Sequence, residues 1–439
     1  MVGWILLGLA VRLVLVPFHH PWDLQTWYNM FVDLARDRSP YETFRDLTYL
    51  TRALWGEVAI TGKFFDGVRA SFYGYYAYPP LPLLLYYPLA KLYAAVHPLA
   101  YRFVVEGAVA AHRIPASFGL VFKAPLFVAD LGVALLLWRL AGERAARAFF
   151  LNPLVVLVSG AWMIDSLAAV FAVLGLLLAR QGRHGPAGAA LALGALAKWI
   201  PAVLWPAVGL WLLRRGAPPR AHLAFHAAFL TVLAAGLLPF WDGIRLVAEF
   251  HAQRPGGNLT PHILLYVLAQ FGVPHLDLAY HVISPLVGTV TLPAALLVAY
   301  VTIWRRALPL STAAALVLIA FLLGSKTVNE PYVYLLLPIL LWEAAERPTP
   351  AKTVLFRAVY ALPLAFAIVG VPVLMFALPL YVHLTTLDPV VGYTLSPVLP
   401  RQPHALALAV IALAFVGTLL WGWCTVLKET EHALPAAVP

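Results

Sequence analysis

The sequence has 439 residues, of which 62% are hydrophobic and only 11% are charged, and its mean hydropathy is +0.82. Soluble domains carry about 25% charged residues, so this composition excludes a water-soluble globular protein. The single cysteine, Cys424, excludes an internal disulfide framework and a cysteine-based metal cluster. The net charge of +10 fits basic loops on the cytoplasmic side of a membrane better than it fits binding to nucleic acid.

The first apolar segment, Val2 to Pro17, lacks the basic start and the small-residue cleavage site of a signal peptide, so we interpret it as a membrane anchor. A long polar and aromatic outer loop, about 19–114, separates it from the next clear span at 115–138. Inside this loop, the proline-rich segment 78–96 predicts a re-entrant or interfacial hairpin. If 78–96 crossed the membrane instead, the segment 104–111 would have to return across it.

Further apolar segments predict more spans along the rest of the chain. They cover 148–160, 166–179, a segment from 188 that is broken at Lys198 and Pro201, 221–240, 283–304, 308–324, 331–342, 355–381 and 406–427. Basic residues fall in every second loop, which is the positive-inside pattern and places both termini in the cytoplasm. The sequence therefore predicts one all-α polytopic membrane domain over 1–439, with roughly twelve transmembrane helices.

The start of the outer loop has apolar residues at helical spacing from Leu24 to Ala35. Because Asp33, Arg36 and Asp37 fall on the other side, the pattern predicts an amphipathic helix in the membrane interface. Such a helix either guides a lipid substrate toward a polar chamber or only caps the bundle.

The unusual polar residues collect on the face opposite the arginine-rich loops. They are Asp23, Asp165, Lys198, His251, Arg254, Lys326 and Glu330. A charge at membrane depth costs about 2.5–3.5 kcal/mol on insertion scales, so such residues usually face a cavity and serve a function. These residues therefore predict one polar chamber at the outer surface; the alternative is loop charge that simply contacts water.

Sugar transfer from a lipid phosphate needs a base for the acceptor proton and cations for the leaving phosphate. Asp23 is the best candidate base, because it lies where the first span emerges. Arg254 offers a planar set of donors for a phosphate, and Lys326 and Lys198 offer point charges at the same level. His251 is either a further phosphate donor or an ordinary surface histidine.

A metal is possible but is not indicated, because the chain contains no Asp-x-Asp pair. His19 and His20 with Asp23 would make only a partial site, and magnesium prefers oxygen ligands. There is no phosphate-binding P-loop and no Gly-x-Ser-x-Gly elbow, so ATP-driven pumping and serine hydrolysis are not indicated. Arg12, inside the first span, either snorkels outward or reaches a ligand phosphate.

Motifs in the outer loop resemble the catalytic subunit of the GPI mannosyltransferase and its prokaryotic relatives, which are membrane glycosyltransferases of the GT-C superfamily. The matching stretches are Asp23-Leu-Gln-Thr-Trp27, Asp33-Leu-Ala-Arg36, Ser39-Pro-Tyr41 and Tyr78-Pro-Pro-Leu81. The family's first motif is Asp-x-Asp, whereas this chain has Pro21-Trp-Asp23 and so lacks the first carboxylate.

The resemblance continues in order over about three quarters of the chain. The later stretches are Lys123 with Asp130, Asn152-Pro153 with Ser159 and Asp165-Ser166, Lys198-Trp-Ile-Pro201, His251-Ala-Gln-Arg254, Asn258-Leu-Thr-Pro261 and Lys326-Thr-Val-Asn329-Glu330-Pro-Tyr332. The pair Asn329-Glu330 also resembles the His-Glu of lipid-linked glucosyltransferases in the same superfamily, so the donor sugar stays open.

The resemblance implies a GT-C-like bundle that takes a sugar, expected to be mannose, from polyprenyl or dolichyl phosphate with inversion. No cofactor is expected, because the chain lacks the family's Asp-x-Asp motif. The resemblance also implies that Asp23 is the general base and that Arg254 and Lys326 bind the donor phosphate. From their position in the sequence, Lys198 and His251 are expected to be further phosphate ligands. The substrate chamber is expected to include Asp165, Glu330, Asn329, Tyr78, Tyr41 and Arg12. The expected acceptor is a glycolipid, a lipid-linked glycan or a protein at the extracytoplasmic face. If the source is prokaryotic, the membrane is expected to be the plasma membrane. A secondary transporter of a polar or anionic solute and a non-catalytic lipid-binding subunit remain alternatives.

Overall fold

A computed structural model describes residues 2–17, 21–42, 76–99, 114–160, 163–253, 257–273, 276, 284–370, 386–387 and 401–431. Most of the described residues are helical. Among them, five helices are long and apolar enough to cross a membrane, and four shorter apolar helices accompany them. The protein is therefore a polytopic membrane protein, as the composition predicts. The expected number of roughly twelve spans stays a prediction.

The helices run in chain order as α1 (Val2–Val14), α2 (Pro21–Ala35), α4 (Leu81–Val96), α5 (Ala116–Ala141), α6 (Glu143–Phe150), α7 (Pro153–Gly160), α8 (Asp165–Arg180), α9 (His184–Ala197), α10 (Leu204–Arg214), α11 (Pro219–Leu237), α12 (Trp241–Gln253), α13 (Ile263–Gln270), α15 (Ser284–Arg305), α16 (Leu310–Gly324), α17 (Leu336–Glu346), α18 (Pro350–Gly370) and α20 (Arg401–Glu431). Short 3₁₀ helices are η2 (Ile200–Val203), η3 (Leu238–Phe240) and η5 (Glu330–Leu335). Strand β1 (Ile114–Pro115) pairs antiparallel with β4 (Thr386–Leu387), and β2 (Gly257–Asn258) pairs parallel with β3 (Thr327–Val328).

The expected span 148–160 is interrupted. Helix α6 ends at Phe150 and α7 begins at Pro153, with Asn152 between them. The Asn152 side chain accepts a hydrogen bond from the Leu154 amide at 2.9 Å, which caps α7 and fixes the break. The predicted break at Lys198 and Pro201 is confirmed, because α9 ends at Ala197 and η2 precedes α10.

The segment 78–96 forms one helix, α4, rather than a hairpin. A proline just before the helix and another in its first turn suit a helix start, and Pro88 is accommodated inside. Tyr86 and Tyr93 are buried, whereas Leu92 and Val96 are exposed. The segment 104–111, whose return across the membrane was the alternative, lies outside the described residues.

Helix α2 differs from the predicted interfacial helix. Residues 26–34 are all buried, and Asp33, expected on the water side, is only 1% exposed. The helical spacing identifies the apolar face correctly, but α4, α5 and α12 contribute buried residues to the same cluster and cover the other faces too. The expectation fails because tertiary neighbours, not helical periodicity, decide which faces meet water. Arg36 and Asp37 are exposed, as predicted.

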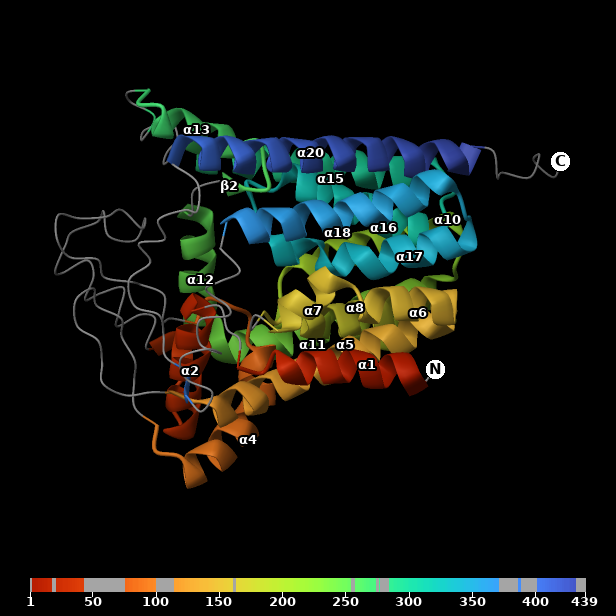
Figure 1. The fold of residues 1–439 in the computed structure, drawn as a ribbon. Coiled ribbons are helices and arrows are strands. Elements are labelled where there is room, and N and C mark those ends of the chain that lie inside the picture. The colour runs from red at the N-terminus through yellow and green to blue at the C-terminus, as the bar shows by residue number, and fades with distance from the viewer. Residues whose placement is uncertain are drawn as a thin grey trace.

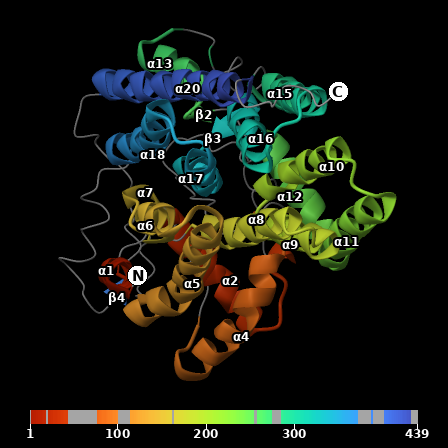
Figure 2. The ribbon, with the colours of Figure 1, turned by 90° about the vertical axis from the view of Figure 1, so that its right-hand side faces the viewer.

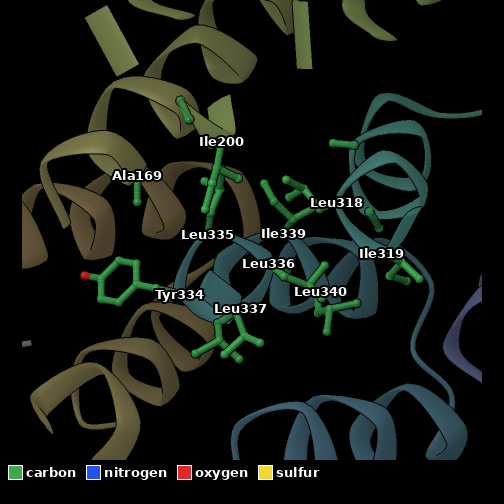
Figure 3. Packing of buried hydrophobic residues seen from close by; sticks show 14 of the residues in the cluster. Ala169, Ile200, Leu318, Ile319, Tyr334, Leu335, Leu336, Leu337, Ile339 and Leu340 are labelled. Carbon is green, nitrogen blue, oxygen red and sulfur yellow. The ribbon is translucent and has the colours of Figure 1, made fainter. Parts of the chain in front are cut away.

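The larger apolar core surrounds α16 and α17. Almost every residue of α16 is buried, which suits a helix that is apolar on all sides and lies inside the bundle. In Figure 3, Ile339 and Leu340 of α17 lie toward Leu318 and Ile319 of α16, and Leu335 lies toward Ile200.

The bundle has two chemically different ends. The start of α1 and the end of α20 lie at one end, and α2 and α12 lie at the other (Figure 1). At the first end the Trp4 indole donates to Glu143 at 2.9 Å, and Arg180 pairs with Glu346 at 3.3 Å. We call this the basic end. We call the opposite end, made by segments 76–80, 251–253, 257–260 and 325–332 with Asp165 and Lys198, the loop end.

Candidate functional site

Two distant loop segments are joined at the loop end by the β2–β3 pair. The Gly257 amide donates to the Lys326 carbonyl at 2.9 Å, and the Leu259 amide donates to the Val328 carbonyl at 3.0 Å. Asn258 adopts a left-handed backbone conformation, with φ of 59°, which asparagine tolerates better than most residues. Its side-chain amide donates to the Asn329 side-chain oxygen. The loop before η5 is thereby fixed to the segment after α12.

Lys326 and His251 connect this pair to two further segments. The Lys326 ammonium donates to the Ala252 carbonyl at 2.6 Å, so a cation sits at the C-terminal end of α12, where the helix dipole favours it. The His251 Nε2 atom lies 3.1 Å from the Ala77 carbonyl oxygen. Burial and the nearby Lys326 charge lower the pKa of His262. The structure thus brings the predicted residues Lys326 and His251 into one neighbourhood.

An aromatic layer supports the same neighbourhood. The Tyr41 hydroxyl donates to the Tyr78 carbonyl at 2.7 Å, and the Tyr78 ring stacks on Trp27 with 4.9 Å between centroids. Burial raises the pKa of Tyr41, so its hydroxyl stays protonated at neutral pH. Gly243 is required beside it, because a Cβ there would lie 2.4 Å from the Tyr41 Cβ. The predicted chamber residues Tyr41 and Tyr78 therefore lie together.

Lys198 and Asp165 form an ion pair of 2.6 Å, with the side chains 12% and 5% exposed. Asp165 begins α8 and Lys198 follows the last residue of α9, so each charge lies at the helix end whose dipole stabilises it. The Lys198 ammonium also lies 4.7 Å from the centroid of the Tyr332 ring. Lys198 therefore has a carboxylate partner within the chain before any substrate binds.

Arg12 does not belong to the loop end. Its Nε donates to Asp130 of α5 at 2.7 Å, both side chains are 0% exposed, and the Tyr334 hydroxyl donates to the same carboxylate. Further donation goes to the Gly8 and Phe150 carbonyls. The side chain neither snorkels outward nor faces a chamber, because Asp130 supplies its counter-charge inside the bundle.

Lys123 also has a structural partner that the sequence alone did not reveal. It is fully buried on α5, and its ammonium donates to the Leu15 and Val16 carbonyls at 2.6 and 3.0 Å. A cation at the end of a helix satisfies carbonyls that lack intrahelical donors. Asp130 follows Lys123 by seven residues, two helical turns, so both residues face α1. This spacing is the signal that could have found the interface.

The remaining predicted residues are only partly described. Asp23 lies in the first turn of α2, and nothing further is described of it. Arg254, His19 and His20 lie outside the described residues. Glu330 begins η5, and Asn329 directly precedes it. In the part of the chain that the structure describes, no group of three or more histidine, cysteine or acidic residues is placed to hold a metal ion.

No family model matches this sequence, and no curated protein matches it. Among solved structures, the chain is similar to the crystal structure of ArnT from Cupriavidus metallidurans bound to undecaprenyl phosphate. The sequence identity is 14%, the TM-score is 0.43, and the match covers 98% of this chain and 79% of that chain. At this identity and score, the similarity assigns neither a family nor an activity.

Proposed function

We propose that the protein is an inverting membrane glycosyltransferase of the GT-C type that uses a polyprenyl-phosphate sugar. One observation carries the proposal. The loop end joins segments 76–80, 251–253, 257–260 and 325–332, which come from distant parts of the sequence and carry stretches of the GT-C-like pattern. A pattern that arose by chance from composition would have no reason to converge at one end of the bundle.

In the proposed reaction, the acceptor hydroxyl attacks the anomeric carbon of the donor sugar. The bond from that carbon to the phosphate oxygen breaks, the proton goes to the Asp23 carboxylate, and polyprenyl phosphate leaves. Arg254 is the next residue in the sequence after α12, and we assign Arg254 and Lys326 to the phosphate on the strength of the family resemblance. Lys198 is assigned a positioning role instead, because Asp165 already binds its ammonium.

Mannose is the donor sugar that we propose, with a glycolipid, a lipid-linked glycan or a protein as acceptor. We also propose that the loop end faces the extracytoplasmic side. Support comes from the arginine-rich turns at the opposite end, together with the positive-inside rule. The start of α1 and the end of α20 share that basic end, so both termini would be cytoplasmic (Figure 1).

The test is transfer of radiolabelled mannose from synthetic polyprenyl-phosphate mannose by the purified protein, with membrane lipid extract as acceptor. Asp23→Asn should lower the rate about 100- to 10,000-fold, because it removes the proposed general base. Asp242→Asn, which changes an exposed carboxylate of α12, is the matched control and should retain activity. Parallel reactions with EDTA test whether transfer needs a divalent metal, and glucose and pentose donors test the sugar.

A secondary transporter is the second candidate, because the chain has a helix break between α9 and α10 beside a charged pair. Uptake of a radiolabelled anionic solute into proteoliposomes, with no transfer from any donor, would favour it. Full transfer by Asp23→Asn would remove Asp23 from its assigned role. Lipid binding without either activity would favour a non-catalytic subunit.

A further inference from the structure

Four exposed arginines lie on two turns at the basic end. Arg183 is in the turn between α8 and α9, and Arg214, Arg215 and Arg220 flank the turn between α10 and α11. We call these four residues the arginine patch. In Figure 2, which views the molecule from this end, α10 and α11 lie side by side at the edge of the bundle.

Both turns have a fixed backbone. Gly182 and Gly216 have φ values of 75° and 66°, which glycine adopts without a steric penalty. The Arg183 amide donates back to the Leu178 carbonyl at 2.9 Å, and the Ala217 amide donates back to Leu212 at 3.1 Å. These long back-bonds are those of the Schellman motif, which ends a helix in a defined geometry. The backbone that carries the arginines is therefore already in place before a ligand arrives.

Close helix packing brings the two turns together. A Cβ on Gly188 of α9 would lie 2.1 Å from the Phe225 carbonyl of α11, and one on Gly185 would lie 3.9 Å from the Ala224 carbonyl. The two helices are therefore parallel and in contact near their starts. Their N-terminal ends add partial positive charge next to Arg183 and Arg220.

Within the described residues, the neighbouring segments supply no counter-charge to the patch. Residues 166–241 contain no aspartate or glutamate. The nearby Glu346 is already bound by Arg180 at 3.3 Å, the Ser311 hydroxyl at 2.6 Å and the Trp342 indole at 2.8 Å. In the described part of the chain, no carboxylate forms an ion pair with the patch.

Glu343, a buried acid of the same helix, is likewise occupied. Arg347 and Lys352 lie 2.8 and 2.9 Å from its carboxylate. Both acids of α17 are thus bound by other side chains, whereas the arginines of the patch are exposed. Among the described residues, this arrangement leaves the positive charge of the patch available to an external anion.

Apolar side chains border the patch on the same helices. Leu213 and Leu223 are 48% and 71% exposed, and α11 belongs to a long helix whose apolar window is only 11% buried. Arginine guanidinium groups bind phosphate oxygens in pairs, and exposed leucines beside them suit acyl chains. We propose that the arginine patch binds the phosphate headgroup of an anionic bilayer phospholipid. This site lies at the end opposite the loop end and does not depend on the proposed function.

The experiment is native mass spectrometry of the purified full chain with phosphatidylglycerol, and with phosphatidylcholine of the same acyl chains. The patch variant carries Arg183→Gln, Arg214→Gln, Arg215→Gln and Arg220→Gln. An arginine near an anionic lipid surface contributes about fivefold in affinity. The patch variant should therefore bind phosphatidylglycerol at least about tenfold more weakly, with binding of phosphatidylcholine unchanged.

The matched control removes four exposed arginines of other helices, Arg139→Gln, Arg144→Gln, Arg305→Gln and Arg357→Gln. It makes the same change in net charge but leaves the arginine patch intact, so phosphatidylglycerol binding should stay within about twofold of the unmodified protein. Equal loss of phosphatidylglycerol binding in both variants would show that the lipid binds a diffuse basic surface, and would overturn the proposed site. Displacement of the lipid by an equal concentration of inorganic phosphate would assign the patch to a soluble anion and overturn the bilayer source. Thermal unfolding of both variants separates loss of binding from loss of folding.

Discussion

Two ion pairs in this molecule look alike in the sequence and differ in their surroundings. Arg12–Asp130 and Lys198–Asp165 each join a cation to an aspartate, at 2.7 and 2.6 Å. The first lies between α1 and α5 and has no exposed side-chain surface. The second closes the ends of α8 and α9 at the loop end and retains partial exposure beside Tyr332.

The comparison teaches that a charge within an apolar segment has two different uses. In the first pair the charges satisfy each other and hold two helices together, and both lie beyond the reach of water. In the second pair the charges stabilise two helix ends and lie next to the loops that carry the motif residues. Burial, rather than residue type or membrane depth, separates the structural pair from the candidate functional one.

The largest effect should come from breaking the buried pair. Asp130→Leu leaves the Arg12 guanidinium buried without its counter-charge and should lower the free energy of unfolding by about 3–5 kcal/mol. The measurement is equilibrium unfolding of the purified protein in mixed micelles of increasing sodium dodecyl sulfate. The double variant Arg12→Met with Asp130→Leu should regain most of that loss. A double variant as unstable as the single one would contradict a role for the pair.

Breaking the partly exposed pair should cost less and should affect activity more. Lys198→Met should lower the free energy of unfolding by about 1–3 kcal/mol, because Asp165 loses a charged hydrogen-bond partner but still has some access to water. Under the proposed function, it should also lower the transfer rate, since Tyr332 of η5 loses its contact with the Lys198 ammonium. Lys198→Arg is the control and should retain most of the stability and most of the transfer rate. Unchanged transfer in a folded Lys198→Met would limit Lys198 to a structural role.

A smaller effect is expected at Lys123, the buried cation of α5. Lys123→Met removes the ammonium that binds the Leu15 and Val16 carbonyls. This change should lower the free energy of unfolding by about 1–2 kcal/mol. The same micelle titration measures it. Lys91→Met is a useful comparison, because that lysine binds the Ala35 carbonyl near the surface, where water can replace it. If Lys91→Met were the more destabilising change, burial would not be the deciding factor.

The smallest effect is a pH dependence at the surface. Hydrogen bonds from Lys91 and Tyr87 lower the pKa of Asp37 below its ordinary value of 3.8. The stability that this carboxylate contributes is therefore present above about pH 3.8 and is lost as the pH falls through the lower folded-state pKa. The thermal midpoints of the unmodified protein and Asp37→Asn should differ at pH 6 and converge in acid, to about pH 2. A difference that persists at that pH would contradict this assignment.

Much of the architecture follows from local sequence features. The break at Lys198 and Pro201 is predictable because a proline in a helix interior removes a hydrogen bond and clashes with the preceding turn. The helical spacing from Leu24 to Ala35 likewise predicts α2. The burial of Asp33 is not predictable in this way, because it depends on α4, α5 and α12, which pack around α2 from distant parts of the chain.

The sequence by itself determined that this is a helical membrane protein, that one helix breaks at Lys198 and Pro201, and which residues are candidates for chemistry. Those properties follow from apolar length, proline position and the cost of charge in a bilayer, all of which act locally. Only the tertiary structure decided which charges pair. Arg12 and Asp130 are separated by 118 residues, and Lys326 meets Ala252 across 74 residues. A partner at such separation is chosen by how the helices pack. Periodicity along one helix shows which residues share a face, but it does not show which helix that face meets.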